Sequence, residues 1–570
     1  MQNRLAHVLL ISAAFLLSFA ALFLGRAADD NSLFSWAWVF ATIDASRIYF
    51  LLIASLVLSF FLSRTSLSDH YQIPFLAVLS FAVILPFWKE SEIVVDASRY
   101  FTQAKYLEVY GIRYFLNEWG GTIPAWTDMP IVPFLYGLIF KFFGESRSAI
   151  QLFATVLFSL TTVFTYLIGK TLWDRETGFS AGLLLLGIPY LMTQVPLMLA
   201  DVPTMFFLTL AIYAFLAAMN KGGVARNFFS SAAIVFVVLS KYSTWFMLSV
   251  LAVVLVVYSI GPAGSKDRRP LIRGAAILVA AAAVSGIILL LKFGVVSEQI
   301  HLLREYQGPG LARWGESFHS TFLFQIHPFI TISAAASLIV ALRKRDARYA
   351  IISWLLLLVV LFGIRRIRYT LPLFPMLTLM AAYGLQVIRL DELRRFILCG
   401  TVTTSLAIGI FAYLPLAESM SAANLKHAGE YLNTLGPGEI EVITLVPGEP
   451  AANPAVAVPL LDLFTDRQIR YFYRKEGFPP QEEIERSSLR FTWEYLNPVY
   501  YSAGPHAAAN VPIVVISEAS NGPLPQTVAR RLEGYKLSKA FDASEKIFQY
   551  SVGVRIYQKA SSSPVPNTRD

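Results

Sequence analysis

The segment Asp96-Ala97-Ser98-Arg99-Tyr100 lies near the start of a polar, aromatic-rich stretch, Trp88 to Tyr136, that interrupts a series of long apolar runs. A second short motif, Thr127-Asp128-Met129-Pro130, lies near the end of this stretch. The first motif puts a proton acceptor, a cation and an aromatic hydroxyl beside a predicted membrane boundary, where ionisable groups are functional by default. We therefore expect a substrate with an apolar tail in lipid and a polar head in water.

The composition is that of a membrane protein. Of the 570 residues, 56% are hydrophobic and only 15% are charged, which is far more apolar than a soluble protein of this size. The net charge of +9 does not indicate a nucleic-acid partner, because Lys and Arg lie mostly at the ends of apolar runs, as the positive-inside rule predicts. The single cysteine, Cys399, excludes an internal disulfide and a cysteine-based metal site.

The apolar runs predict about 13 membrane spans, at about 20 residues for each crossing. The first run, His7 to Leu24, is long for a secretory signal peptide and no clear cleavage site follows it, so we expect a retained span. The other runs are Ile48–Leu62, Ile73–Trp88, Ala149–Gly169, Phe179–Leu199, Val202–Met219, Phe228–Ser240, Thr244–Ile260, Leu271–Leu291, Phe322–Leu342, Tyr349–Ile364, Tyr369–Ile388 and Phe396–Leu416.

Basic residues in the short loops predict the orientation. If the N-terminus is inside, every short inner loop contains Lys or Arg, as expected for the cytoplasmic side. The same count places Trp88 to Tyr136, Asp201, Lys241 and everything after Leu416 outside. The outer turn Arg365-Arg366-Ile367-Arg368-Tyr369 breaks the rule, and each unpaired Arg near hydrocarbon costs up to about 3 kcal/mol. We therefore expect this turn to bind an anion.

The chain after Leu416 loses its long apolar runs and gains Pro, Gly and charge. We interpret residues 417–570 as a soluble α/β domain on the outer face, after two additional N-terminal spans in residues 1–72 and a membrane catalytic domain in residues 73–416 with an outer loop at 89–136. The elements expected in the soluble domain are a helix over Leu425–Leu435 and strands over Ile440–Val446, Gln468–Tyr473, Val511–Ser517 and Gly553–Gln558.

Several motifs resemble those of the GT-C fold, the lipid-phosphate-sugar-dependent glycosyltransferases of the protein mannosyltransferase and lipid A aminoarabinose transferase type. The resemblance covers roughly Ile73 to Leu416, and it departs from the family pattern at Ala97, where a second acidic residue is frequent, and at Met129, where a Lys is frequent. The matching segments are Asp96 to Tyr100, Asp128-Met129-Pro130 through Phe142-Phe143-Gly144, Asp201-Val202-Pro203, Leu239-Ser240-Lys241, and Arg368-Tyr369-Thr370-Leu371-Pro372 with Pro375.

The resemblance implies an inverting glycosyltransferase that uses a polyprenyl-phosphate sugar and a hydroxyl acceptor on a protein, lipid or glycan. Asp96 is then the candidate catalytic base, which needs hydrogen-bond reach to the acceptor; its alternative roles are a helix cap or a partner for Arg99. Asp201 is the second catalytic candidate, to orient the acceptor or to hold a divalent cation with Asp96. A helix cap before Pro203 is the simpler alternative.

The leaving lipid phosphate needs fixed cations, and Arg offers bidentate geometry for phosphate. An alternative role for these cations is to bind anionic lipid head groups or to pair with Asp128 and Asp201. The candidate phosphate-binding residues are Arg99, Lys241, Arg366, Arg368 and Tyr369. The candidate substrate-loop residues are Tyr100, Asp128, His301 and Arg304, of which the last two form either a lid or a solvated turn.

Two other classes of protein fit part of the pattern. A transporter or flippase of lipid-linked saccharide also has many spans, but such proteins usually show internal repeats and midplane charges, whereas here no repeat is visible and the charges gather at one face. A surface-glycan polymerase or ligase shares the donor and would use residues near His301 to His319. The preferred hypothesis is a multi-pass enzyme of the cytoplasmic (inner) membrane, with its N-terminus inside and its C-terminal domain outside.

Overall fold

A computed structural model describes the chain, and its contacts form two compact units. Unit 1 comprises residues 1–90, 125–133 and 148–417, and unit 2 comprises residues 91–124, 134–147 and 418–570. The described residues are 2–41, 43–65, 67–260, 268–308, 315–419, 422–445, 452–471, 478–487, 489–494, 498–501, 511–518, 524–542 and 552–560.

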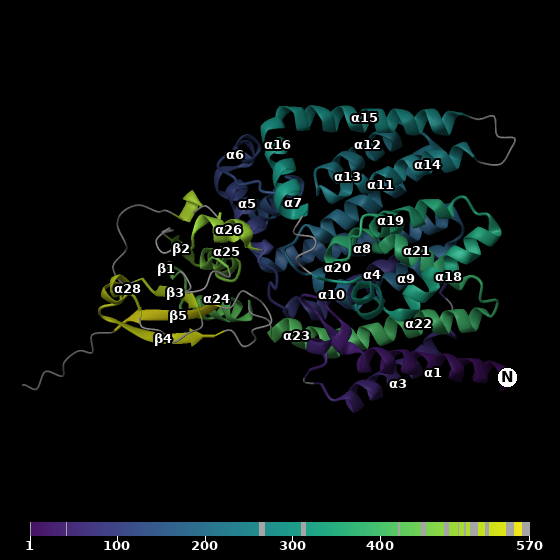
Figure 1. The fold of residues 1–570 in the computed structure, drawn as a ribbon, viewed down its shortest axis with the longest axis horizontal. Helices are drawn as coiled ribbons and strands as arrows, with labels where there is room; N and C mark the ends of the chain where they lie inside the picture. Colours follow the sequence, from purple (N-terminus) through teal and green to yellow (C-terminus); the bar gives the residue numbers. More distant parts are fainter. Residues whose placement is uncertain are drawn as a thin grey trace, which may run out of the picture. The chain divides into compact units, whose positions relative to one another are not determined.

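Unit 1 is helical throughout its described part (Figure 1). Seven helical segments are long and apolar enough to cross a membrane: Leu5–Leu24, Ala45–Leu62, Asp69–Lys89, Arg147–Leu172, Asp201–Lys221, Arg269–Leu291 and Asp391–Ser419. The helices of this unit are α1 (Gln2–Leu24), α2 (Trp36–Val39), α3 (Ala45–Leu62), α4 (Gln72–Ile84), α8 (Arg147–Leu172), α9 (Arg175–Leu185), α10 (Pro189–Gln194), α11 (Asp201–Lys221), α12 (Val224–Val238), α13 (Ser243–Met247), α14 (Ser249–Ser259), α15 (Arg269–Leu291), α16 (Phe293–Leu302), α18 (Pro328–Lys344), α19 (Tyr349–Leu361), α20 (Ile367–Thr370), α21 (Phe374–Leu385), α22 (Asp391–Ile408) and α23 (Leu414–Ser419).

The predicted polytopic helical fold is confirmed, while the number of crossings stays a prediction. Several predicted runs are interrupted: Phe179 to Leu199 divides into α9 and α10, and Tyr369 to Ile388 divides into α20, a short 3-10 turn and α21. Proline explains both breaks, because it lacks an N–H donor and favours the first turn of a new helix. Pro189 begins α10, and Pro375 lies in the first turn of α21.

Helix α11 is the central helix of unit 1. Of its most apolar 18-residue window, 89% is buried inside the protein, against 11% for the corresponding window near the N-terminus. Nearby helices approach one another through small residues, which allow close backbone contact in membranes. A Cβ on Gly384 of α21 would lie only 2.2 Å from the carbonyl oxygen of Ser333 in α18. This packing fixes the ends of the helices that carry the charged residues discussed below.

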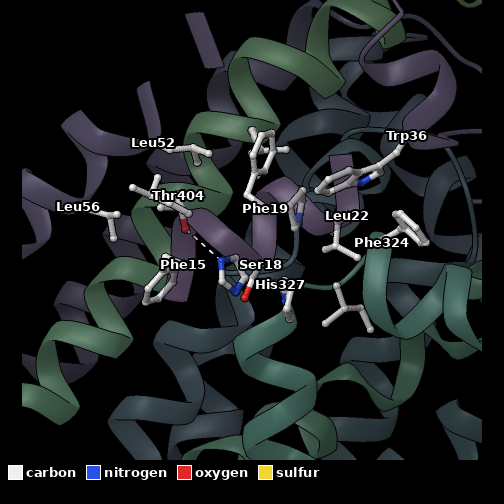
Figure 2. A pocket seen from close by; sticks show the side chains of 15 residues that line it. Phe15, Ser18, Phe19, Leu22, Trp36, Leu52, Leu56, Phe324, His327 and Thr404 are labelled. Carbon is white, nitrogen blue, oxygen red and sulfur yellow. Dashed lines mark hydrogen bonds between the residues drawn. The ribbon is translucent and has the colours of Figure 1, made fainter. Parts of the chain in front are cut away.

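The N-terminal helices α1 and α3 pack on α22 (Figure 1). Phe15 of α1 stacks on Phe329 with ring centroids 3.9 Å apart, and the His327 ring bonds the Thr404 hydroxyl at 3.1 Å. Figure 2 shows the apolar pocket that Phe15, His327 and Thr404 help to line. Its void of about 30 Å³ is close to the volume of one water molecule, so this pocket is a packing feature and is too small for a sugar or lipid.

Unit 2 combines the outer-loop segments with the C-terminal chain. Its five-stranded sheet has the order β2-β1-β3-β5-β4; β1 pairs in parallel with β2 and β3, and β5 pairs antiparallel with β3 and β4. Helix α5 packs on α25. The elements are α5 (Asp96–Tyr110), α6 (Ile112–Glu118), α7 (Ile131–Phe143, shared with unit 1), α24 (Ala423–Thr434), β1 (Glu439–Thr444), α25 (Ala457–Asp462), β2 (Gln468–Tyr471), α26 (Gln481–Arg486), α27 (Arg490–Trp493), β3 (Ile513–Glu518), α28 (Gln526–Arg531), β4 (Tyr535–Phe541) and β5 (Val552–Lys559).

The predicted α/β fold of the C-terminal chain is confirmed in its elements, while its bounds as a separate soluble domain and its outer placement stay predictions. The expected helix is α24, and the four expected strands are β1, β2, β3 and β5. The expected strand residues Val446, Phe472 and Tyr473 lie outside the described residues. Strand β4 was not predicted. Residues 91–124 and 134–147 of the predicted outer loop and its flank belong to unit 2 with the C-terminal chain, whereas residues 125–133 belong to unit 1.

Candidate functional site

Asp201 is the centre of a buried charged cluster in unit 1. It is the first residue of α11, and its side chain is 1% exposed. Oδ1 accepts a hydrogen bond from Lys241 Nζ at 2.5 Å, and Oδ2 accepts one from Arg368 Nε at 2.9 Å. Lys241 lies in the turn between α12 and α13, and Arg368 lies in α20. Three segments that are far apart in sequence therefore meet at one carboxylate.

Tyr369 and Glu316 extend this cluster. The Tyr369 ring centroid lies 5.6 Å from Lys241 Nζ and 5.4 Å from the Arg366 guanidinium carbon, within the range of cation–π attraction. Arg366 Nε lies 3.6 Å from Glu316 Oε1, and Glu316 Oε2 accepts the backbone N–H of Ile367 at 3.2 Å. Tyr369 thus lies beside two cations, and Glu316 fixes the start of α20.

Cationic side chains gather in this cluster. Among the contacts described here, three cations, Lys241, Arg366 and Arg368, lie with two carboxylates, Asp201 and Glu316, and three minus two gives these five side chains a formal charge of +1. Cations that the protein holds in fixed positions favour an anionic group that enters among them. A phosphate group has the geometry that guanidinium groups prefer.

Tyr190 lies beside the same charges and was not predicted from the sequence. Its side chain is fully buried in α10, close enough to interact electrostatically with Asp201, Glu316 and the two arginines. Within the described part of the chain its hydroxyl has no hydrogen-bond partner. A buried hydroxyl of this kind is available to a ligand that enters the cluster.

Asp96 and Arg99 lie in unit 2, on the first turn of α5. Their side chains are an i,i+3 pair, with Arg99 Nη2 3.4 Å from Asp96 Oδ1. The Arg99 guanidinium carbon also lies 4.9 Å from the Phe491 ring centroid and 5.7 Å from that of Tyr100. The Asp96 carboxylate is 19% exposed. It therefore has a cationic neighbour, Arg99, and can also be reached by a ligand at the protein surface.

The other predicted substrate-loop residues divide into buried and exposed ones. Tyr100 and Asp128 are buried. The Asp128 carbonyl oxygen accepts a hydrogen bond from Gln299 Nε2 at 2.8 Å, and Tyr242 donates to Gln299 Oε1. Gln299 thus ties α16 to the Asp128 segment and to the turn that carries Lys241. His301 and Arg304 are exposed.

His301 pairs with Glu305 one helical turn further on, with His301 Nε2 3.0 Å from Glu305 Oε2. The described structure therefore places His301 and Arg304 on a solvated helical surface beside Gln299, rather than in the Asp201 cluster. The lid role of these two residues stays a prediction.

Unit 2 contains a second buried charged cluster that the sequence did not predict. Lys105 Nζ lies 2.8 Å from Glu145 and 2.6 Å from Asp462, whose Oδ2 also accepts the Tyr501 hydroxyl at 2.7 Å. Burial raises the pKa of Glu145 to about 7 and that of Asp462 to about 6, although Lys105 opposes both shifts. Burial alone would lower the pKa of Lys105, but the two carboxylates hold it above its ordinary value.

The described residues do not offer a donor set for the divalent cation considered above. No group of three or more His, Cys, Asp or Glu side chains that could hold a metal ion occurs in this part of the chain. Both oxygens of Asp201 bind cationic side chains. The geometry therefore favours a role for Asp201 in holding Lys241 and Arg368.

Comparison with known proteins gives one family match. Residues 127–288 match the family described as dolichyl-phosphate-mannose-protein mannosyltransferase, and this range includes Asp128, Asp201 and Lys241. No curated protein shows significant sequence similarity to the chain.

Solved structures show the fold. ArnT from Cupriavidus metallidurans bound to undecaprenyl phosphate is similar at a TM-score of 0.53 and 11% identity, over 86% of this chain and 98% of that one. The apo state of ArnT from Cupriavidus metallidurans has a TM-score of 0.50 and 13% identity, over 84% of this chain and 97% of that one. A third structure is the archaeal oligosaccharyltransferase AglB from Archaeoglobus fulgidus, in complex with an inhibitory peptide and a dolichol-phosphate. Its TM-score is 0.47 and its identity 12%, over 80% of this chain and 70% of that one.

The chain has the fold of ArnT, a membrane glycosyltransferase of the GT-C class. The family match and the fold together confirm the predicted resemblance to glycosyltransferases that use polyprenyl-phosphate donors, and they agree with the apolar helices in placing the protein in a membrane.

Proposed function

We propose that the protein is an inverting glycosyltransferase that moves a sugar from a polyprenyl-phosphate donor to a hydroxyl acceptor at the outer face of the cytoplasmic membrane. The observation that carries the proposal is the buried cluster in which Lys241, Arg366 and Arg368 meet around Asp201 and Glu316. Such a cluster suits a lipid phosphate, the leaving group of this reaction. ArnT was solved with undecaprenyl phosphate bound.

The cluster would act by stabilising charge on the leaving group. As the bond between the anomeric carbon and the phosphate oxygen breaks, its electron pair moves to the phosphate. Fixed cations that meet this developing charge lower the barrier, and removal of one such donor typically costs about 100- to 1000-fold in rate. Arg368 and Lys241 are fixed by Asp201 in advance, so little reorganisation is needed during the reaction.

Asp96 is the proposed catalytic base. In an inverting transfer the acceptor oxygen attacks the anomeric carbon and gives its proton to a base, and the resemblance of the Asp96 to Tyr100 segment to the family's acidic motif supports Asp96 for that role. The Asp96 carboxylate is 19% exposed and lies beside Arg99, so an acceptor can reach it. Asp201 is less suited to proton transfer, because both of its oxygens bind cations; we propose that it positions Lys241 and Arg368.

The proposed orientation places the N-terminus inside and the C-terminal domain outside. The basic short loops support it. The acceptor would then be a hydroxyl on a protein, lipid or glycan of the cell envelope.

Transfer of radiolabelled sugar from a panel of polyprenyl-phosphate sugars, with membrane extract as acceptor, tests the proposal. We expect transfer by the wild type and a loss of at least about 100-fold in Asp96→Asn. Asp44→Asn is the matched control, because Asp44 is an exposed cap of α3 and Asn caps helices equally well. Absence of transfer and of donor hydrolysis with every donor would instead support a transporter, and an equally active Asp96→Asn would remove Asp96 as the base.

A further inference from the structure

A cleft in unit 1 is not used by the proposed reaction, because its lining does not include Asp201, Lys241 or Arg368. It has a volume of about 540 Å³ and lies between the ends of α3, α4, α9 and α22, a size typical of ligand pockets, which span about 300–1,000 Å³. We call it the α9–α22 cleft.

The α9–α22 cleft has a charged mouth and apolar walls. On α22, Arg395 lies at the mouth and Val402 lies on the wall, seven residues further along, or about 10 Å at 1.5 Å per residue. That depth is a large part of the roughly 15 Å half-thickness of a bilayer core. The mouth residues are Asp69, Arg175, Glu176, Asp391, Arg394 and Arg395, and the main wall residues are Phe75, Leu79, Phe179, Leu183, Leu398 and Val402. This polarity gradient matches one leaflet of a lipid.

The charges at the mouth are unevenly paired. Arg175 pairs with Asp69, while the single guanidinium of Arg394 binds both Glu176 and Asp391. Arg395 lines the cleft, is half-buried and forms no ion pair or hydrogen bond with any residue that the structure describes. The mouth has three arginines and three carboxylates and is therefore neutral in total. Its charges are separated, however: Arg395 is a positive group, and it lies beside Glu176 and Asp391, which share the single guanidinium of Arg394.

Such a mouth is complementary to a zwitterion rather than to a simple anion. Asp391 and Arg395 are one turn apart on α22, which places their Cβ atoms about 5–6 Å from each other. A head group with a phosphate diester and a primary ammonium joined by a short linker could meet both: the phosphate on Arg395 and the ammonium on Asp391. A primary ammonium has N–H groups that can donate hydrogen bonds to the carboxylate oxygens, whereas a quaternary ammonium has no N–H group and cannot form these bonds.

We propose that the α9–α22 cleft is a binding site for an aminophospholipid such as phosphatidylethanolamine, with its head group at the mouth and an acyl chain along the apolar walls. The cleft lies among the short basic loops that we predict to be cytoplasmic, and the proposal is independent of the glycosyltransferase function.

Native mass spectrometry of the full chain in detergent, titrated with separate lipids, tests this site. We expect phosphatidylethanolamine to be retained at least about tenfold more tightly than phosphatidylcholine or phosphatidylglycerol, the difference expected from one charge-assisted hydrogen bond. Arg395→Gln should remove this preference. Arg64→Gln is the matched control, because Arg64 stacks on Phe60 near the same end without lining the cleft, and it should retain the lipid as the wild type does.

The only cysteine allows a second variant that does not alter a charge. Cys399 lines the cleft, so Cys399→Trp should fill it and expel the lipid, while Cys399→Ser should not. Equal retention of the three phospholipids, unchanged retention in Arg395→Gln, or retention of lipid by a folded Cys399→Trp would each overturn the proposal. Preferential retention of undecaprenyl phosphate would also overturn it, because the cleft would then belong to the carrier lipid.

Discussion

Replacement of Asp201 by Asn tests whether one carboxylate holds the cationic cluster together. The substitution keeps the shape of the side chain and removes its charge, so Lys241 and Arg368 lose their shared partner. The cluster then has three cations and one carboxylate, Glu316, and its formal charge rises from +1 to +2. Because Arg368 is only 7% exposed, solvent cannot replace the lost interaction well.

The expected destabilisation follows from burial. Removal of one partner from a buried ion pair costs about 3–5 kcal/mol, and we expect the lower value because Lys241 is 21% exposed. At about 2 °C for each kcal/mol in a large domain, the apparent unfolding temperature should fall by about 6 °C. In Asp201→Asn with Lys241→Gln the formal charge returns to +1, and at least half of the loss should be recovered.

Tryptophan fluorescence of the purified full chain, recorded at one fixed heating rate, measures these differences. Asp69→Asn is the control: it breaks the ion pair with Arg175, whose two side chains are more than half exposed, and such pairs contribute only about 0–1 kcal/mol. The reasoning is refuted if Asp201→Asn lowers the unfolding temperature no more than Asp69→Asn does, or if the double variant is as unstable as the single one.

Two further predictions concern unit 2 and helix packing. The folded pKa of Glu145 is about 7 against an ordinary value of 4.5, so the folded chain binds more protons between these pH values, and the contribution of Glu145 to the free energy of unfolding falls as the pH rises from 4.5 to 7. The unfolding temperature of the wild type minus that of Glu145→Gln should therefore decrease over this range; a constant difference would contradict the prediction. Gly384→Ala should destabilise the chain by about 1–3 kcal/mol or more because its Cβ would meet the Ser333 carbonyl, whereas Gly286→Ala, which has open space around it, should stabilise the helix by about 0.5–1 kcal/mol. Thermal unfolding of both variants checks this pair, and equal effects would contradict it.

The sequence predicted the helical membrane fold because long apolar runs are a direct consequence of the bilayer solvent. It also named Arg99, Lys241, Arg366, Arg368 and Tyr369 as phosphate-binding candidates. Of these, Lys241, Arg366, Arg368 and Tyr369 lie together in unit 1 and Arg99 belongs to unit 2, and their binding of phosphate stays a prediction. Strand β4 was missed for a physical reason: it has no buried residue, and a register shift between Leu537 and Lys539 interrupts its alternation of apolar and polar residues.

The remaining site residues could not be found from local patterns. Glu316 reaches Arg366 from a separate loop, and Tyr190 interacts with the cluster only because α10 breaks off from the preceding helix. Lys105 and Asp462 are 357 positions apart. Such contacts are set by tertiary packing, for which a single sequence has no periodic signal. The half-buried position of Asp96 on α5 likewise depends on how the loop folds against the C-terminal chain.

The affinity of the purified protein for undecaprenyl phosphate, compared with its affinity for the uncharged polyprenol, tests most directly whether the cluster binds a lipid phosphate. We predict that the wild type binds the phosphate at least about tenfold more tightly than the alcohol, and that Arg368→Gln reduces this ratio by about tenfold or more, as expected for a charged hydrogen bond. Arg64→Gln should leave it unchanged. Equal affinities for the phosphate and the alcohol, or an unchanged ratio in Arg368→Gln, would contradict the account.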